Sequence, residues 1–277
     1  MAKRQPVIFN EKRLRQLMEK SGVDLAILRL NDNSKYVSEF FNNGGTLTYR
    51  PFTVFFFCDP AIDPAFIVPA VDLHLAMDST WIEDVRAYAM AEFFTDVDAD
   101  FYEDFFVAAK AVLEDRKVRG MVIGTEGDGL PVSYQIRLNE LLAGNRIVDF
   151  SAQMELARMV KTPEEIRRIK RATDITIMAH ASFRDAIKVG NTDHDLFQAA
   201  SRRMIDEGAE GFRFISIGCG PQTSYARMRR SRSAPESAPA TSSRSTWAPA
   251  ISAMVPTSFA PTLSAMPRSA TRRFGSG

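Results

Sequence analysis

Two kinds of hydrophobic pattern alternate along the first 150 residues. Short apolar runs bounded by turn residues predict buried strands, and longer segments with apolar residues three or four positions apart predict amphipathic helices. The predicted strands are residues 24–30, 53–58, 65–69, 119–126 and 146–150. The predicted helices are residues 11–22, 98–116 and 133–144. Strands that alternate with helices of this length indicate an α/β layer structure.

From Ser151 onward the pattern becomes mainly helical. The predicted helices run from Ser151, as the cap, to about Val160, from Pro163 to Gly190, and from Thr192 to Glu207. Two of them begin with a capping box, formed by Thr162 with Glu165 and by Thr192 with Asp195. Residues 211–221 then predict a strand that runs into a Gly-rich turn. Long helices followed by strands indicate a second, α+β domain.

Composition narrows the class of protein. The 277 residues are 45% hydrophobic and 25% charged, as in soluble globular proteins, and they suffice for two domains. No apolar run reaches the roughly 20 residues of a membrane helix, and the amino terminus lacks the apolar segment of a signal peptide. Cys58 and Cys219 lie far apart, without metal or disulfide spacing, and are expected to be reduced thiols of a cytoplasmic protein.

Residues 227–277, called the tail below, differ from the rest of the chain. The tail holds 11 Ser, 9 Ala, 8 Arg and 6 Pro, with one acidic residue and no Lys. The net charge of +1 therefore hides a negatively charged region over residues 1–226. That region offers no general basic surface for nucleic acid.

Four segments, taken in order, carry a resemblance to a known family. They are N-S-K-Y-V-S-E-F (33–40), V-K-T-P-E-E-I-R-R-I-K-R-A (160–172), G-N-T-D-H-D (190–195) and F-R-F-I-S-I-G-C-G-P-Q-T-S (212–224). The chain resembles the creatinase and Xaa-Pro aminopeptidase family over residues 7–226. The resemblance implies a creatinase-like α/β domain over residues 1–155, followed by the first third of a truncated α+β "pita-bread" catalytic domain over residues 156–226.

The resemblance also implies a chemistry. Intact members are expected to bind two divalent metal ions (Mn, Co or Zn) through two Asp in a D-x-G…D pattern, one His and two Glu. The metals activate a bridging water that cleaves an Xaa-Pro peptide or a small metabolite, and some members are lyases. In the family a further His, which usually contacts the substrate, follows the G-P-x-[ST] turn. That position holds Arg227 here, and no Asp follows Asp206. No catalytic residue and no metal ligand is therefore assigned, and the chain as written is expected to bind no catalytic metal and to be inactive.

A homodimer is also implied, in which one subunit lends residues to its partner's active site. Arg50 is a candidate of this kind for binding a substrate carboxylate. The alternative is that Arg50 is an ordinary loop arginine in solvent. The intact N-terminal domain could also serve as a non-catalytic dimerisation module.

The codons of the tail permit a frameshift. When the third base of each codon is joined to the first two bases of the next, Trp247 and Met254 must each give a Gly codon. Thr246 and Thr257 give codons of the form NAC, which include Asp, eleven positions apart. The junction at residues 227–228 permits a His codon. We interpret the tail as a frameshift product of a longer protein; a genuine disordered linker and a degraded paralogue are the alternatives.

The remaining candidate residues have plainer interpretations. His180 is expected to be a partly buried packing residue, His194 a surface residue, and His74 lacks partners at ligand spacing. The carboxylates Asp96, Asp98, Asp100, Glu103 and Asp104 lack calcium-loop spacing and are expected to form a solvated helix start. The segments GTEGDG (124–129) and GCGP (218–221) match no phosphate-binding motif. The family resemblance implies that Gly218 and Gly220 let the backbone approach a substrate or cofactor at the mouth of the cleft.

Overall fold

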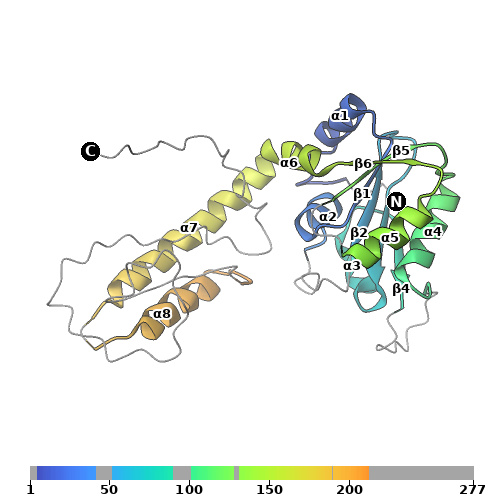
Figure 1. Ribbon diagram of the computed structural model, residues 1–277. Coiled ribbons are helices and arrows are strands. Elements are labelled where there is room, and N and C mark those ends of the chain that lie inside the picture. Colours follow the sequence, from blue (N-terminus) through green and yellow to red (C-terminus); the bar gives the residue numbers. More distant parts are fainter. Residues whose placement is uncertain (1–4, 42–51, 90–100, 128–130, 189, 212–277) are drawn as a thin grey trace, which may run out of the picture. The chain divides into compact units, whose positions relative to one another are not determined.

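The computed structural model describes residues 5–41, 52–89, 101–127, 131–188 and 190–211, and it divides into two compact units (Figure 1). The first unit covers residues 1–164 and the second covers residues 165–277.

The first unit is built on a six-stranded mixed sheet in the order β4-β3-β2-β1-β5-β6. The strands are β1 (Leu25–Leu28), β2 (Thr53–Phe57), β3 (Ala65–Pro69), β4 (Asp84–Tyr88), β5 (Val122–Thr125) and β6 (Arg146–Asp149). β1, β2 and β3 pair antiparallel in succession, whereas β3–β4, β1–β5 and β5–β6 pair parallel. Every residue of the central strands β1, β2 and β3 is buried, as expected for a sheet covered on both faces.

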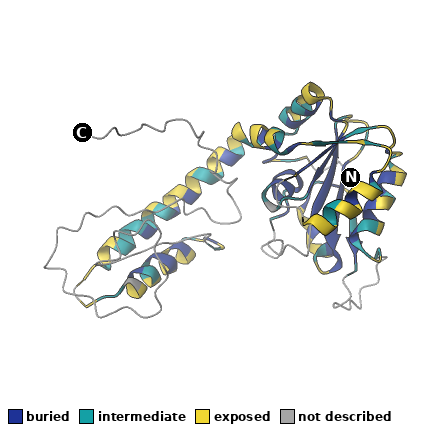
Figure 2. Ribbon diagram, in the orientation of Figure 1, coloured by how far each residue is buried: buried dark blue, intermediate teal, exposed yellow. Residues whose placement is uncertain are grey.

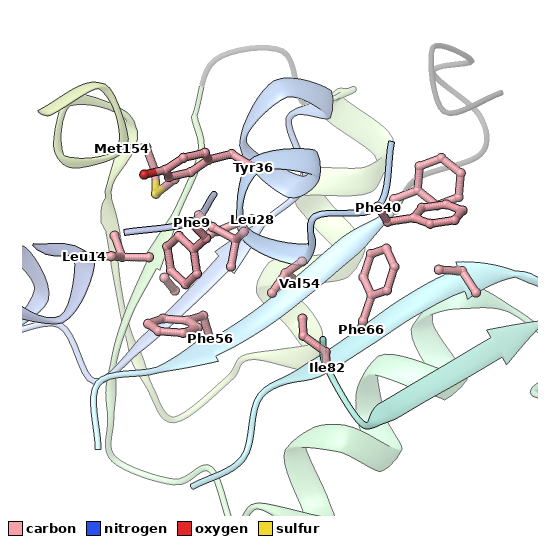
Figure 3. Packing of buried hydrophobic residues seen from close by; sticks show 14 of the residues in the cluster. Phe9, Leu14, Leu28, Tyr36, Phe40, Val54, Phe56, Phe66, Ile82 and Met154 are labelled. Atoms are coloured by element: carbon pink, nitrogen blue, oxygen red, sulfur yellow. The ribbon is translucent and has the colours of Figure 1, made fainter. Parts of the chain in front are cut away.

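One face of the sheet packs on four helices. These are α1 (Glu11–Ser21), α2 (Asn31–Ser38), α3 (Leu73–Ser79) and α6 (Ser151–Met159). Leu14 of α1, Tyr36 of α2 and Met154 of α6 share one hydrophobic cluster with Phe56 and Phe66 of the sheet (Figure 3). Alternate strand residues supply this cluster because side chains of a strand point to opposite faces.

The opposite face packs on α4 (Phe105–Asp115) and α5 (Val132–Leu141). Phe105 and Val112 of α4 and Leu138 of α5 lie in one cluster with Phe55 and Ile67 of the sheet. The sheet therefore forms the buried middle layer, and the helices expose their outer sides (Figure 2). The α/β layer structure predicted for this part of the chain is confirmed.

Two helices and one strand of the first unit were missed from the sequence: α2, α3 and β4. α2 has the sequence NDNSKYVS, which is poor in strong helix formers. β4 carries Asp84 and Arg86 between its apolar residues, a period-two alternation typical of an edge strand. Arg86 forms ion pairs with Asp84 and, at 2.8 Å, with Asp115 of α4, which compensates these charges.

Two predicted helix starts differ from the structure, one by seven residues and the other by one. α4 begins at Phe105, and not near residue 98, because Tyr102 pairs with the outer edge of β4 and Asp104 caps the helix. α6 begins at Ser151 itself, so Ser151 is not its cap. The carboxylate of Asp149 instead accepts hydrogen bonds from the Ser151 N–H and hydroxyl, at 3.1 and 2.7 Å.

The second unit contains α8 (Asp193–Asp206) and most of α7 (Pro163–Asp185), the helix that crosses the boundary between the units. A small cluster of Ile175, Ala179, Ala200 and Met204 joins the two helices. The capping box of Thr192 and Asp195 is confirmed. α7 ends five residues before the predicted stop at Gly190. The predicted strand at residues 211–221 lies almost entirely outside the described residues.

Candidate functional site

The carboxyl ends of β1 and β5 are the place in the first unit where a ligand site is expected from topology. The chain leaves β1 toward β2 on one side, whereas β5 pairs with β1 on the other side. In open α/β sheets, such a reversal of strand order opens a crevice at the carboxyl ends of the two strands. The residues that follow β1 and β5 are therefore the ones expected to line such a site.

A buried carboxylate occupies this position. Glu126 directly follows β5 and has only 1% of its surface exposed. Its Oε2 accepts hydrogen bonds from the backbone N–H groups of Arg29 and Leu30, both at 2.6 Å, and its Oε1 accepts one from the side-chain amide of Asn33. The Asn33 carbonyl oxygen in turn accepts a bond from the Arg158 guanidinium of α6, at 2.8 Å. Glu126 thus ties the turn between β1 and α2 to β5 and, through Asn33, to α6.

The electrostatics of Glu126 are a balance of opposing effects. Burial raises the pKa of Glu126, because removal from water disfavours the charged form. The hydrogen bonds from Asn33, Leu30 and Arg29 and the positive charge of Arg158 lower it, but they do not overcome the burial. The pKa therefore stays above its ordinary value.

A cluster of aromatic and arginine side chains includes Arg29, which follows β1. The Arg29 guanidinium lies 4.3 Å from the centre of the Tyr134 ring, and Tyr134 packs against Phe105 and Phe106. Arg137 lies 3.9 Å from the centre of the Phe106 ring. Burial raises the pKa of Tyr134, because removal from water disfavours the charged phenolate.

The geometry of Glu126 fits a structural role better than a catalytic one. Both of its oxygens already accept hydrogen bonds from the protein, and the side chain is sealed from solvent. The neighbouring Gly124 has a packing role, since a Cβ there would lie 2.8 Å from Phe150. The GTEGDG segment therefore serves sheet packing and the Glu126 network in its described part, consistent with its failure to match a phosphate motif. A carboxylate placed directly after a buried strand was the signal that sequence reasoning passed over.

The three histidines are not brought together. His74 and His194 are exposed, on α3 and α8, and His194 lies 2.9 Å from the Gln198 amide. His180 is half-buried in α7, and burial lowers its pKa, which favours the neutral imidazole. The packing role predicted for His180 and the surface position predicted for His194 agree with these locations.

The acidic segment before α4 is described only in part. Asp104 is the cap of α4, accepting from the Val107 N–H at 2.9 Å, and it pairs with Arg137 at 2.8 Å. Partial burial alone raises its pKa, but the bonds from Arg137 and Val107 outweigh this and leave it below the ordinary value. Asp104 thus caps the start of α4, in agreement with the predicted position at a helix start. The candidates outside the described residues are Asp96, Asp98, Asp100, Arg50, Cys219, Gly218 and Gly220.

Cys58, at the end of β2, is a free thiol at the margin of the core. Burial raises its pKa, and nearby Glu19 adds to the effect, so the thiol is a poor nucleophile at neutral pH. Within the described ranges, no three His, Cys, Asp or Glu residues come together as a metal-binding group. No helix in those same ranges is long and apolar enough to cross a bilayer.

The comparison with protein families agrees with this architecture. The family described as the Creatinase/Prolidase N-terminal domain matches residues 11–160, more than half of the chain. The chain belongs to this family. The match spans α1 to α6, so the creatinase/prolidase domain is the sheet and the helices that cover its two faces.

Individual creatinase/prolidase relatives extend the similarity beyond residue 160. Creatinase of Bacillus sp. (strain B-0618) is 24% identical over 203 residues, which are 72% of this chain and 45% of that protein. The X-Pro aminopeptidase of Thermotoga maritima is 22% identical with a TM-score of 0.58, over 75% of this chain and 52% of its own. The prolidase of Pyrococcus horikoshii is 18% identical with a TM-score of 0.62, over 82% and 57%. The chain therefore shares their fold but spans about half of their length.

Proposed function

We propose that the chain is the amino-terminal half of a metal-dependent hydrolase that, when intact, cleaves Xaa-Pro peptide bonds. The support is the order of features along the chain: the creatinase/prolidase domain over residues 11–160 is followed directly by α7, which starts at the T-P-E-E-I sequence. Solved proteins that share this fold include an X-Pro aminopeptidase and a prolidase. In this proposal, residues 1–155 are the N-terminal domain and residues 156–226 begin the catalytic domain of a cytoplasmic homodimer.

The match to creatinase favours a second candidate function, in which the intact enzyme is a hydrolase or a lyase that acts on a small metabolite. A third candidate is a non-catalytic dimerisation module made from the first unit. Size-exclusion chromatography with light scattering tests the third candidate on the chain as it stands. Assays of the restored full-length enzyme with Xaa-Pro dipeptides and with small amidino compounds separate the first two.

The residues present do not fit a dinuclear metal site. The described part brings together no metal-binding group, and after Asp206 the sequence contains no Asp and only three Glu: Glu207, Glu210 and Glu236. Two metals that share a water need carboxylates converging from several segments. We propose that the chain as it stands is inactive because the tail replaces the remaining ligand-bearing segments.

The first experiment is to resequence the coding DNA from codon 220 to well beyond the stop codon. We expect a shifted frame that opens at codons 226–227 and continues with D-x-G…D and two later Glu codons. The printed chain, purified, is expected to hold no Mn or Zn and to lack peptidase activity, whereas the restored chain is expected to hold two equivalents. An uninterrupted reading frame without these codons, or metal-dependent activity in the printed chain, would refute the proposal.

Arg50 is proposed to contact a substrate carboxylate in the restored dimer. Arg50→Ala should raise the Michaelis constant about tenfold or more, because a charge-assisted hydrogen bond contributes roughly 1.5–3 kcal/mol. The measurement is steady-state kinetics, with Arg119→Ala, an exposed arginine of the first unit, as the matched control. An unchanged Michaelis constant for Arg50→Ala would remove this role.

A further inference from the structure

The segment at residues 7–10 belongs to no helix or strand, yet three of its backbone N–H groups are bound to one side chain. Oε1 of Glu39 accepts hydrogen bonds from three successive N–H groups: Val7 at 2.8 Å, Ile8 at 2.5 Å and Phe9 at 2.8 Å. Successive N–H groups that converge on one point form a concave anion-binding nest. Here the anion is supplied by the protein itself.

Glu39 is held in an unusual backbone position. It follows the last residue of α2 with φ of 56°, in the left-handed region that non-glycine residues seldom occupy. A left-handed residue is a common way to end a helix, but Gly and Asn occupy it at less cost than Glu. A Glu in this position, with its Oε1 bound by three N–H groups, suggests that the carboxylate is what the site requires.

The side chains of the segment continue the contact into the core. Phe9 is 4% exposed and meets the rings of Tyr36 and Phe56 edge-on, each with centroids 5.4 Å apart (Figure 3). The Tyr36 hydroxyl also accepts from the Asn10 N–H, at 3.1 Å. Residues 7–10 are therefore fixed to α2 through both backbone and side chains.

The same segment reaches the end of the first unit. The carbonyl oxygen of Ile8 accepts a hydrogen bond from the hydroxyl of Thr162, at 3.2 Å, one residue before α7. One turn further into the chain, Arg13 of α1 donates to the Leu156 carbonyl of α6, at 2.9 Å. The amino-terminal segment thus lies between Glu39 on one side and the chain leading into α7 on the other.

We infer that residues 7–10 are a strap that the Glu39 carboxylate locks, and that this lock controls how firmly Thr162 is held at the start of α7. When the Glu39 hydrogen bonds are lost, the backbone of residues 7–9 is held less firmly, and the Ile8 carbonyl offers Thr162 a less stationary acceptor. Glu39 is therefore a positioning residue for Thr162, just before α7, acting through the backbone of residues 7–9. Neither the family match, which begins at residue 11, nor the proposed chemistry assigns this role.

The test uses Glu39→Gly in the full chain, because Gly adopts the left-handed conformation without strain, so the carboxylate is removed without new strain at this position. Amide hydrogen exchange of Val7, Ile8 and Phe9 should accelerate about 10- to 100-fold, as expected for loss of hydrogen bonds to a charged group. Sodium formate should restore much of the protection by placing a carboxylate in the nest, whereas sodium chloride at equal ionic strength should not. Glu39→Asn, which also tolerates the left-handed region, repeats the test should the Gly variant fold poorly.

The coupling between Glu39 and Thr162 is measured with Thr162→Val, which removes the hydroxyl and keeps the shape of the side chain. Alone, Thr162→Val should accelerate exchange at residues 7–9 by a smaller factor, about tenfold or less. In the Glu39→Gly background it should add almost nothing, because the strap is already open. Unchanged exchange in both Glu39 variants, absence of formate rescue, or simple multiplication of the Glu39 and Thr162 effects would each overturn the inference.

Discussion

Replacing Glu126 by Ala should lower the free energy of unfolding of the first unit by about 3 kcal/mol. The loss leaves the N–H groups of Arg29 and Leu30 and the Asn33 amide without their acceptor, in a region sealed from water. It also removes the negative charge that faces Arg158. Urea denaturation followed by far-ultraviolet circular dichroism measures the change, with Glu155→Ala on the exposed side of α6 as the control. A cost for Glu126→Ala no greater than that of Glu155→Ala would contradict the structural role.

Glu126→Gln separates the charge from the hydrogen bonds. The pKa of Glu126 is raised in the folded state, so below the unfolded value both states carry the proton and the contribution of Glu126 to stability is fully present. As pH rises from the unfolded pKa through the folded pKa, Glu126 loses its proton more easily in the unfolded chain than in the folded one. The contribution of Glu126 to stability is therefore lost over this range. The stability of the wild type relative to Glu126→Gln, which does not titrate, should therefore fall with rising pH above about 4.3, the ordinary Glu pKa. A difference that rises over this range would show that the hydrogen bonds outweigh burial.

Replacing Phe56 by Ala should cost about 3–5 kcal/mol, the range for removing a large aromatic side chain from a packed core. Phe56 is fully buried in β2, meets the Phe9 ring edge-on, and lies beneath the guanidinium of Arg15, 4.6 Å from the ring centre. The neighbours are a strand, a helix and the strap, so they cannot all move inward to fill the cavity. The measurement is the midpoint and slope of urea unfolding.

Two controls bracket the Phe56 result. Phe56→Leu keeps most of the volume and should cost about 1 kcal/mol. Val132→Ala removes an apolar side chain that is 76% exposed on α5, and it should change stability by less than about 0.5 kcal/mol. If Phe56→Ala cost no more than Val132→Ala, the assignment of this cluster as the core of the first unit would be wrong.

The parts of the fold that the sequence predicts well are those with strong hydrophobic periodicity. The strands T-V-F-F-F and A-F-I-V-P agree closely with β2 and β3, because continuous apolar runs between turns leave few alternatives. α2 was missed because its stability comes from distant residues: Glu126 fixes the turn before it, and Glu39 anchors its end to residues 7–9. Such contacts join positions about thirty to ninety residues apart and leave no local pattern.

For function, the sequence alone could be judged only against the metal-ligand pattern of the family. The absence of D-x-G…D can be read from the sequence, whereas the Glu126 hydrogen-bond network cannot. Glu126 stands between two glycines in a segment that suggests a turn, and its role depends on Asn33 and Arg158, which lie far away in sequence. The structural role of a buried carboxylate can be assigned only when its hydrogen-bond donors are known.

The position of β1 in the middle of the sheet has a consequence for synthesis. β1 can pair with β2 as soon as both have left the ribosome, but its other edge pairs with β5, which is made much later. Until Val122–Thr125 emerges, the apolar strand Leu25–Leu28 presents one open row of backbone hydrogen-bonding groups. Open strand edges recruit other chains. Ribosomes that pause before β5 should therefore expose the nascent chain to aggregation, and a chaperone that binds extended apolar segments should associate with it in that interval.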